Sequence, residues 1–147
     1  MKLRTVLLIL IVPTLLAAQQ PDRTHLKSEV AKQRNLPFSS GVLVGNTLYV
    51  AGTTGVGPTT KGTVTAEQEA RMALDNFKQV VEQAGMTMDE IVSLQVFCTD
   101  LTQYETFNKV YASYFHGDFP ARAFLGTDKL LFNARFEING IAVKSAK

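Results

Sequence analysis

Two charged residues stand in apolar stretches near the C-terminal end of this 147-residue chain. Arg122 lies within Phe-Pro-Ala-Arg-Ala-Phe (119–124), and Glu137 lies within Arg-Phe-Glu-Ile-Asn-Gly-Ile-Ala (135–142). A guanidinium is a permanently charged planar fork suited to holding a carboxylate, and a nearby glutamate can order or deprotonate a water molecule. The pair therefore points to a site where water acts on a small carboxylate. A structural ion pair between neighbouring strands or subunits is the alternative interpretation.

Hydrophobic periodicity predicts the first elements that would position this pair. Two β-rich runs, 38–44 and 47–53, flank Gly45-Asn46 and predict a hairpin. The Gly/Thr-rich segment 54–62 is typical of a loop, and its Gly-x-Gly is a weak nucleotide-binding signal because no helix follows it directly. Thr65 and Gln68 then have the spacing of a capping box, and apolar residues at helical spacing continue to Ala84, before Gly85.

The second half of the chain alternates strands and a helix. The run 91–98 is β-branched and aromatic, as in a buried strand. A second helix is expected to start behind Thr102, with Glu105 completing a capping box, and to end near Phe115. Pro120 prevents its continuation, and two strands follow, from 121 to about 125 and from 135 to about 143.

The element order β-β-α-β-α-β-β predicts an α+β fold, in which two helices pack on one face of a mixed sheet. We expect the other face to carry apolar side chains such as those of Val42, Leu48 and Val96. With no further helix to cover that face, self-association is the natural solution.

The first 18 residues have the composition of a secretory signal peptide. A basic start, Met-Lys-Leu-Arg, precedes a nearly continuous apolar run from Val6 to Leu16, and Ala17-Ala18 offers a cleavage site. We therefore expect a signal peptide at 1–18, an N-terminal arm at 19–36 that is mobile apart from one early strand, a domain at 37–147, and a periplasmic or secreted protein. An uncleaved N-terminal anchor is the alternative.

Charge and cysteine content limit the classes of function. The chain has 15 basic and 13 acidic residues, and residues 1–18 include two basic residues and no acid, so 13 of each sign remain. A neutral chain without a basic stripe argues against nucleic acid as a partner, and so against a nuclease. Cys98, the one cysteine, is expected to be a buried strand thiol, with a reactive nucleophile as the alternative. His25 and His116 lack companions at metal-ligand spacing, so no metal is expected.

Seven blocks, in order along the chain, resemble the RidA family (YjgF type, reactive-intermediate or imine deaminases). They are Pro-Phe-Ser-Ser-Gly-Val (37–42), Gly-Asn-Thr-Leu-Tyr-Val-Ala-Gly (45–52), Ala-Leu-Asp-Asn-Phe (73–77), Val-Phe-Cys-Thr-Asp-Leu (96–101), Phe-Asn-Lys-Val-Tyr (107–111), Pro-Ala-Arg (120–122) and Phe-Glu-Ile (136–138). The resemblance covers nearly all of the chain after residue 18.

The resemblance implies a chorismate-mutase-like fold and a homotrimer, whose sheets line a central barrel and whose ligand sites lie in clefts between subunits. It also implies hydrolysis of enamines and imines, such as 2-aminoacrylate, to a 2-keto acid and ammonia, without metal or organic cofactor. Arg122 would hold the substrate carboxylate, Glu137 would handle the attacking water, and the backbone at Gly52 would approach the ligand closely. Asn108 matches a family asparagine, to which we assign structural support.

The sequence departs from the family pattern at three positions around this site. Phe38 stands where the deaminases carry a tyrosine, Ala51 where a serine is frequent, and Phe124 where many members have cysteine or a small residue. Phe38 can pack against a ligand but cannot donate a hydrogen bond, and the bulk of Phe124 is expected to narrow the cleft. The two functional hypotheses are therefore a secreted enamine/imine deaminase and a non-catalytic trimer that binds a small carboxylate between its subunits.

Overall fold

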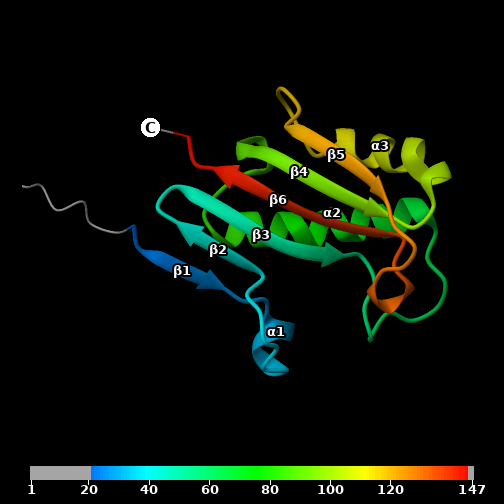
Figure 1. The fold of residues 1–147 in the computed structure, drawn as a ribbon, viewed down its shortest axis with the longest axis horizontal. Coiled ribbons are helices and arrows are strands. Elements are labelled where there is room, and N and C mark those ends of the chain that lie inside the picture. Colours follow the sequence, from blue (N-terminus) through cyan, green and yellow to red (C-terminus); the bar gives the residue numbers. More distant parts are fainter. Residues whose placement is uncertain (1–20, 146–147) are drawn as a thin grey trace, which may run out of the picture.

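The computed structural model describes residues 21–145. Its regular elements, in chain order, are β1 (Arg23–Leu26), α1 (Glu29–Gln33), β2 (Gly41–Val44), β3 (Thr47–Thr54), α2 (Ala66–Gln83), β4 (Ile91–Cys98), α3 (Tyr104–Ala112), β5 (Ala121–Gly126) and β6 (Phe136–Val143). In this part of the chain the strands form one sheet of order β1-β2-β3-β6-β4-β5, in which the β4–β5 pair is parallel and the others are antiparallel (Figure 1). The predicted mixed sheet is confirmed.

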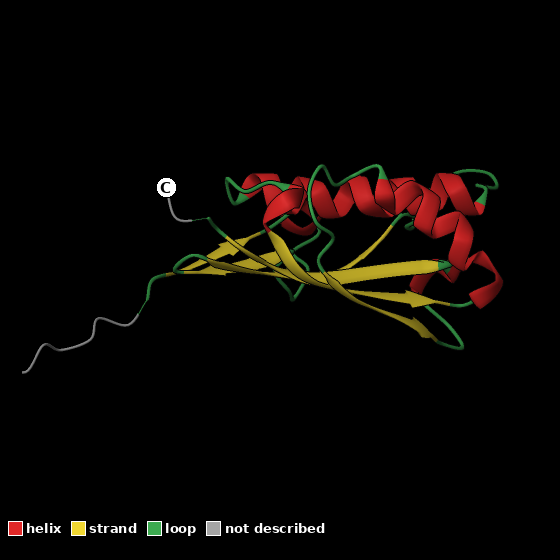
Figure 2. Cartoon of the chain, turned by 90° about the horizontal axis from the view of Figure 1, so that it is seen from above, coloured by secondary structure: helices red, strands yellow, loops and turns green. Residues whose placement is uncertain are grey.

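Helices α2 and α3 lie along the same face of the sheet (Figure 2). The core between the two layers contains fully buried side chains from both, including Phe77 and Phe107 from the helices and Leu48, Val96 and Phe136 from the strands. The predicted α+β layer with two helices on one face is therefore confirmed.

Three glycines of the sheet side let α2 approach closely. A Cβ built on Gly41 would lie 3.0 Å from Cγ1 of Val80, and one on Gly140 would lie 3.1 Å from Cζ of Phe77. A Cβ on Gly55 would overlap the carbonyl oxygen of Glu69. Because any larger residue would push the helix away, these glycines fix how deeply α2 sits on the sheet.

The predicted hairpin and long helix are confirmed. Strands β2 and β3 pair antiparallel, with Val44 opposite Thr47. At the start of α2, Thr65 Oγ1 accepts a hydrogen bond from the Gln68 amide, and Gln68 Oε1 accepts one from the Thr65 amide, so the capping box is complete. Gly85 has a φ of 71°, which ends the helix as predicted.

The start of the second helix differs from the prediction. Asp100, rather than Thr102, provides the cap: its Oδ1 accepts hydrogen bonds from the amide and the hydroxyl of Thr102. A 3₁₀ turn, Leu101–Gln103, follows, and α3 begins only at Tyr104. The capping-box spacing of Thr102 and Glu105 was misleading because a stronger carboxylate cap lies two residues earlier.

The N-terminal arm is part of the fold. Within the predicted arm, 19–36, the expected early strand exists as β1 and pairs with β2, and α1 follows it. The helix α1 was not expected in this arm. The predicted signal peptide, 1–18, lies outside the described residues. Across residues 21–145, no helix is both long and apolar enough to span a membrane.

Two of the three side chains expected on the uncovered face lie on the other one. Leu48 and Val96 are fully buried in the core beneath the helices. Val42 pairs with the exposed Tyr49 and does lie on the open face. The side chains alternate between the two faces as predicted, but the prediction that Leu48 and Val96 lie on the open face is wrong.

Candidate functional site

Arg122 lies on β5 and points to the helix side of the sheet. The strand register places it beside Leu94 of β4, whose other neighbour is Gly140 of β6. Leu94 is buried in the core, and a side chain at Gly140 would meet α2, so this row faces the helices. Nη2 of Arg122 donates a hydrogen bond of 2.7 Å to Oδ1 of Asn108 on α3. This contact agrees with the supporting role expected for Asn108.

Three aromatic rings surround the guanidinium. Its central carbon lies 4.5 Å from the ring centre of Tyr111, and 5.8 Å from those of Tyr104 and Phe124. Cation–π attraction fixes the group without neutralising its charge. Among the described residues no carboxylate lies within 4.0 Å of it. Arg122 is thus a cation in a fixed position, and its remaining N–H groups can donate hydrogen bonds to an anion.

A cavity of about 410 Å³ opens beside this cation. Its lining is mostly apolar and consists of Asn108, Tyr111, Ala112, Phe119, Pro120 and Arg122. A cation at the wall of an apolar pocket attracts an anion more strongly than one in open water, because there is less solvent to screen it. The cavity therefore suits a small organic acid with its carboxylate on Arg122.

The hydroxyl of Tyr111 is buried and has no hydrogen-bond partner among the described residues. Burial raises the pKa of this phenol, and the charge of Arg122 opposes that rise only in part. The hydroxyl is therefore protonated at neutral pH.

Glu137 lies on β6 and points to the open face. Its neighbours in the register are Thr54 of β3 and Phe97 of β4. The β3–β6 ladder is irregular between Val50 and Thr53, and this irregularity brings Gly52 against the glutamate. A Cβ on Gly52 would overlap Oε1 of Glu137, so only glycine leaves room for the carboxylate. The structure thus brings together two of the predicted site residues, Gly52 and Glu137.

Arg122 and Glu137 lie on opposite faces of the sheet. On β4 their register neighbours are Leu94 and Phe97, three residues apart, and side chains an odd number of residues apart point to opposite sides of a strand. Within one chain they form no ion pair. The same small ligand cannot touch both side chains of one chain, because the sheet stands between them. The predicted site is therefore present as two separate halves.

The other predicted site residues fall in different places. Phe38 is 52% exposed and lines a second, shallow cavity beside His25, away from the Arg122 cavity. Phe124 packs edge-on against Tyr104 and Phe107, which fixes it beside Arg122 but outside the cavity lining. Phe124 therefore does not line this cavity within one chain.

The remaining predictions concern the cysteine and the histidines. Cys98 is fully buried and its Sγ donates to the carbonyl of Asp100, while burial raises the pKa of the thiol. The predicted buried strand thiol is confirmed. His25 lies 3.0 Å from the Ser39 hydroxyl, and His116 lies 3.2 Å from an Asp89 carboxylate oxygen. Within residues 21–145, no group of three or more His, Cys, Asp or Glu side chains could hold a metal ion.

Two residues of the Arg122 half were missed from the sequence. Tyr104, Asn108 and Tyr111 are spaced i, i+4 and i+7 on α3, so they form one stripe that faces β5. The spacing was visible in the sequence, but neither tyrosine was selected as a site residue. Only the position of Arg122 in the sheet shows that part of it faces a cation.

Comparisons with known proteins agree on one family. A family model described as endoribonuclease L-PSP matches residues 29–144. A 2-iminobutanoate/2-iminopropanoate deaminase of Dermatophagoides farinae is 36% identical over 120 residues, which cover 80% of this chain and 94% of the relative. The structure of the Escherichia coli YjgF gene product has a TM-score of 0.70 and 34% identity, over 75% of this chain and 90% of that one. The structure of E. coli TdcF with bound serine has a TM-score of 0.70 and 32% identity, over 74% and 89%.

We predict that Gly52→Ala forces the Glu137 carboxylate out of place. The added methyl overlaps Oε1 of Glu137, and because this atom ends a flexible side chain, the cost in the free energy of unfolding should be about 1 kcal/mol, at the low end of the range for overpacking. Gly57→Ala is the matched control, because a Cβ there meets nothing within 4 Å. Urea denaturation measures both variants. Equal stabilities of the two variants would show that the contact between Gly52 and Glu137 is not tight.

Proposed function

The chain belongs to the RidA (YjgF-type) family, and from this premise we propose that it hydrolyses small 2-imino or 2-enamino acids to 2-keto acids and ammonia. The observation that carries the proposal is the cation of Arg122, which is held by Asn108 and aromatic rings at the wall of an apolar cavity, with no carboxylate partner among the described residues. Relatives that are about 35% identical carry the name of imine deaminase.

Arg122 binds the substrate carboxylate in this proposal. A bidentate, charge-assisted contact fixes the reacting carbon one bond away from the carboxylate. The bound serine in the TdcF structure is itself a small amino acid with a carboxylate, which supports a ligand of this class. The apolar lining from Tyr111 to Pro120 suits the carbon side chain of the substrate.

Glu137 handles water and protons. The enamine first takes a proton at carbon and loses one from nitrogen, which gives the imine, and water then adds to the imine carbon. Glu137 accepts a proton from that water and returns it to the nitrogen, and the tetrahedral intermediate collapses to the keto acid and ammonia. Every atom comes from the substrate and one water molecule. The step needs no metal or organic cofactor.

The two halves meet only when two copies of the chain associate. Arg122 faces the helix side at the β5 edge, and Glu137 faces the open side of the sheet, so a second copy has to supply the missing group. A homotrimer in which the open faces line a central barrel brings each β5 edge next to a neighbour. The exposed Tyr49 and Val92 would be covered by this association.

A non-catalytic binder remains the second candidate function. Phe38 and Phe124 contribute no hydrogen-bonding group, whereas Arg122 and its cavity are sufficient to bind a carboxylate. Such a protein would bind keto acids without hydrolysing imines. Assays of turnover and of binding distinguish the two functions.

We expect Arg122→Ala to lower kcat/KM for imine hydrolysis by about 10- to 150-fold, because hydrogen bonds to a charged group contribute about 1.5–3 kcal/mol. An amino-acid oxidase generates the imine in the assay, and semicarbazone formation falls as the protein hydrolyses it. Arg71→Ala, which removes an exposed arginine of α2, is the control and should match wild type.

Titration calorimetry with a 2-keto acid completes this test, and light scattering checks that the variants keep the assembly of the wild type. Binding that depends on Arg122, without turnover of any imine, would favour the binder. If Arg122→Ala equals wild type in both turnover and binding, both functions are wrong.

We also propose that the protein is exported to a periplasmic or extracellular location after removal of residues 1–18, which lie outside the described part of the chain. The basic start followed by an apolar run supports this. Mass spectrometry of the native protein should find an N-terminus close to Gln19. A native protein that retains residues 1–18 would contradict the cleavage.

A further inference from the structure

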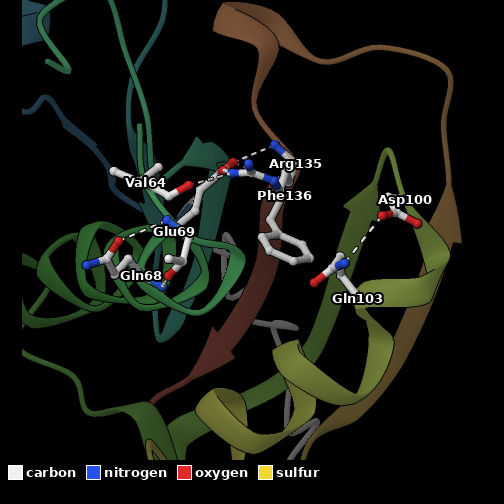
Figure 3. A network of polar contacts seen from close by, with 8 residues as sticks. Val64, Gln68, Glu69, Asp100, Gln103, Arg135 and Phe136 are labelled. Carbon is white, nitrogen blue, oxygen red and sulfur yellow. Dashed lines mark hydrogen bonds and ion pairs between the residues drawn. The ribbon is translucent and has the colours of Figure 1, made fainter. Parts of the chain in front are cut away.

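Glu69 on α2 is a buried carboxylate that the proposed mechanism does not use. It is 1% exposed, and it is the one buried polar or charged residue in the described part of the chain. Its Oε1 accepts hydrogen bonds from the Arg135 amide and, at 3.3 Å, from the Phe136 amide. Its Oε2 accepts a hydrogen bond of 2.6 Å from Nη1 of Arg135. Figure 3 shows this carboxylate between helix α2 and the start of β6.

We propose that Glu69 is a positioning residue for the reaction: it fixes the first residues of β6 and thereby places Glu137. This role presupposes the function proposed above, in which Glu137 acts on water. Arg135 and Phe136 directly precede Glu137 in the chain. The Glu69 carboxylate therefore holds the backbone one and two residues before the reacting side chain.

The contacts of Glu69 are too specific for general packing. A buried carboxylate is costly unless its charge is paired and its lone pairs accept hydrogen bonds, and here three donors meet both needs. Two of the three donors are backbone amides, which no choice of side chain on β6 can replace. The third, the Arg135 side chain, also donates to the carbonyl of Val64, the residue before the cap of α2.

The start of β6 is held from its other side as well. The amide of Thr99, just beyond β4, donates a 3.0 Å hydrogen bond to the carbonyl of Arg135. Glu69 holds the amide of the same residue. Both backbone groups of Arg135 are therefore fixed, and β6 leaves this point in one defined direction.

Helix α2 also holds the strand that carries Gly52. Close packing of Gly55 against the carbonyl of Glu69 places the end of β3 on the same turn of the helix. About two turns later, Nδ2 of Asn76 donates to the carbonyl of Thr54, the residue that pairs with Glu137. One segment of α2 thus sets both strand ends between which Gly52 and Glu137 meet.

The precision of this arrangement matters because Gly52 leaves so little space for the Glu137 carboxylate. A shift of about 1 Å in a reacting group can lower a rate roughly 100-fold. If Glu69 sets the position of β6, kcat should depend mainly on how far the Glu69 carboxylate reaches toward the backbone amides. It should depend less on the negative charge that pairs with Arg135.

Two conservative substitutions separate reach from charge. Glu69→Gln keeps the length and one acceptor oxygen for the backbone amides, but it loses the charge opposite Arg135. Glu69→Asp keeps the charge but withdraws the acceptors by about one methylene, roughly 1.5 Å. Positioning predicts that Glu69→Asp lowers kcat about 10-fold or more with KM changed less than about 3-fold, and that Glu69→Gln stays within about 3-fold of wild type.

Val81→Ala controls for lost stability, since Val81 is fully buried on α2 but far along the helix from Glu69. A purely structural role of Glu69 predicts that both Glu69 variants and Val81→Ala keep the kcat of wild type per folded molecule. It also predicts that Glu69→Gln is the less stable of the two Glu69 variants, because it leaves Arg135 unpaired.

The test measures kcat and KM for imine hydrolysis and, independently of activity, the chemical shift of the ¹³C-labelled Glu137 carboxyl. The proposal expects Glu69→Asp to move this resonance at a fixed pH, whereas Glu69→Gln and Val81→Ala leave it in place. An unmoved resonance in Glu69→Asp, or a larger loss of kcat in Glu69→Gln than in Glu69→Asp, would overturn it. A wild-type protein that is inactive toward every imine would instead refute the proposed function, and the resonance would still decide whether Glu69 positions Glu137.

Discussion

The close packing of α2 on one face of the sheet is the constraint on which the rest of the structure depends. At Gly41, Gly55 and Gly140 no side chain of the sheet stands in the way of the helix, and Phe77 fills the space above Gly140. The strand face under α2 is therefore fixed as the core, and alternation then assigns the remaining side chains to the open face. The location of every candidate functional group follows from this division.

The division of the sheet into a helix face and an open face separates Arg122 from Glu137. Arg122 falls in a row with Leu94 and Gly140, under the helices, where α3 can present Asn108 and aromatic rings to it. Glu137 falls in a row with Phe97 on the open face. The contacts of Arg122 and those of Glu137 are each made within one chain, but the two side chains do not meet in that chain. Under the proposed function, association of copies therefore completes the site as well as covering an apolar surface.

Local signals made much of the fold predictable from the sequence. The Thr65–Gln68 capping box, the turn at Gly45 and the stop at Gly85 were all predicted, because each depends on residues close together in the chain. The face on which Leu48 and Val96 lie was not, because strand alternation gives two faces without saying which one the helices cover. The cap at Asp100 was missed because two acceptable spacings competed.

The candidate site was predictable in its residues but not in its arrangement. Arg122, Glu137 and Gly52 could be selected from residue type and family resemblance, yet nothing in the chain order places the first on one face and the other two on the opposite face. The surroundings of Arg122 form only where α3 packs against β5, and those of Glu69 form only where α2 packs against the start of β6. Such contacts between distant segments cannot be deduced from periodicity.

A site that takes Arg122 from one copy and Glu137 from another can be tested by mixing two inactive variants. Arg122→Ala and Glu137→Ala are combined in equal amounts and allowed to exchange subunits, and imine hydrolysis is measured. Random assembly into a ring places both intact groups at about one quarter of the shared sites, so the mixture should recover about a quarter of wild-type activity. A mixture no more active than either variant alone would show that both groups act from the same chain.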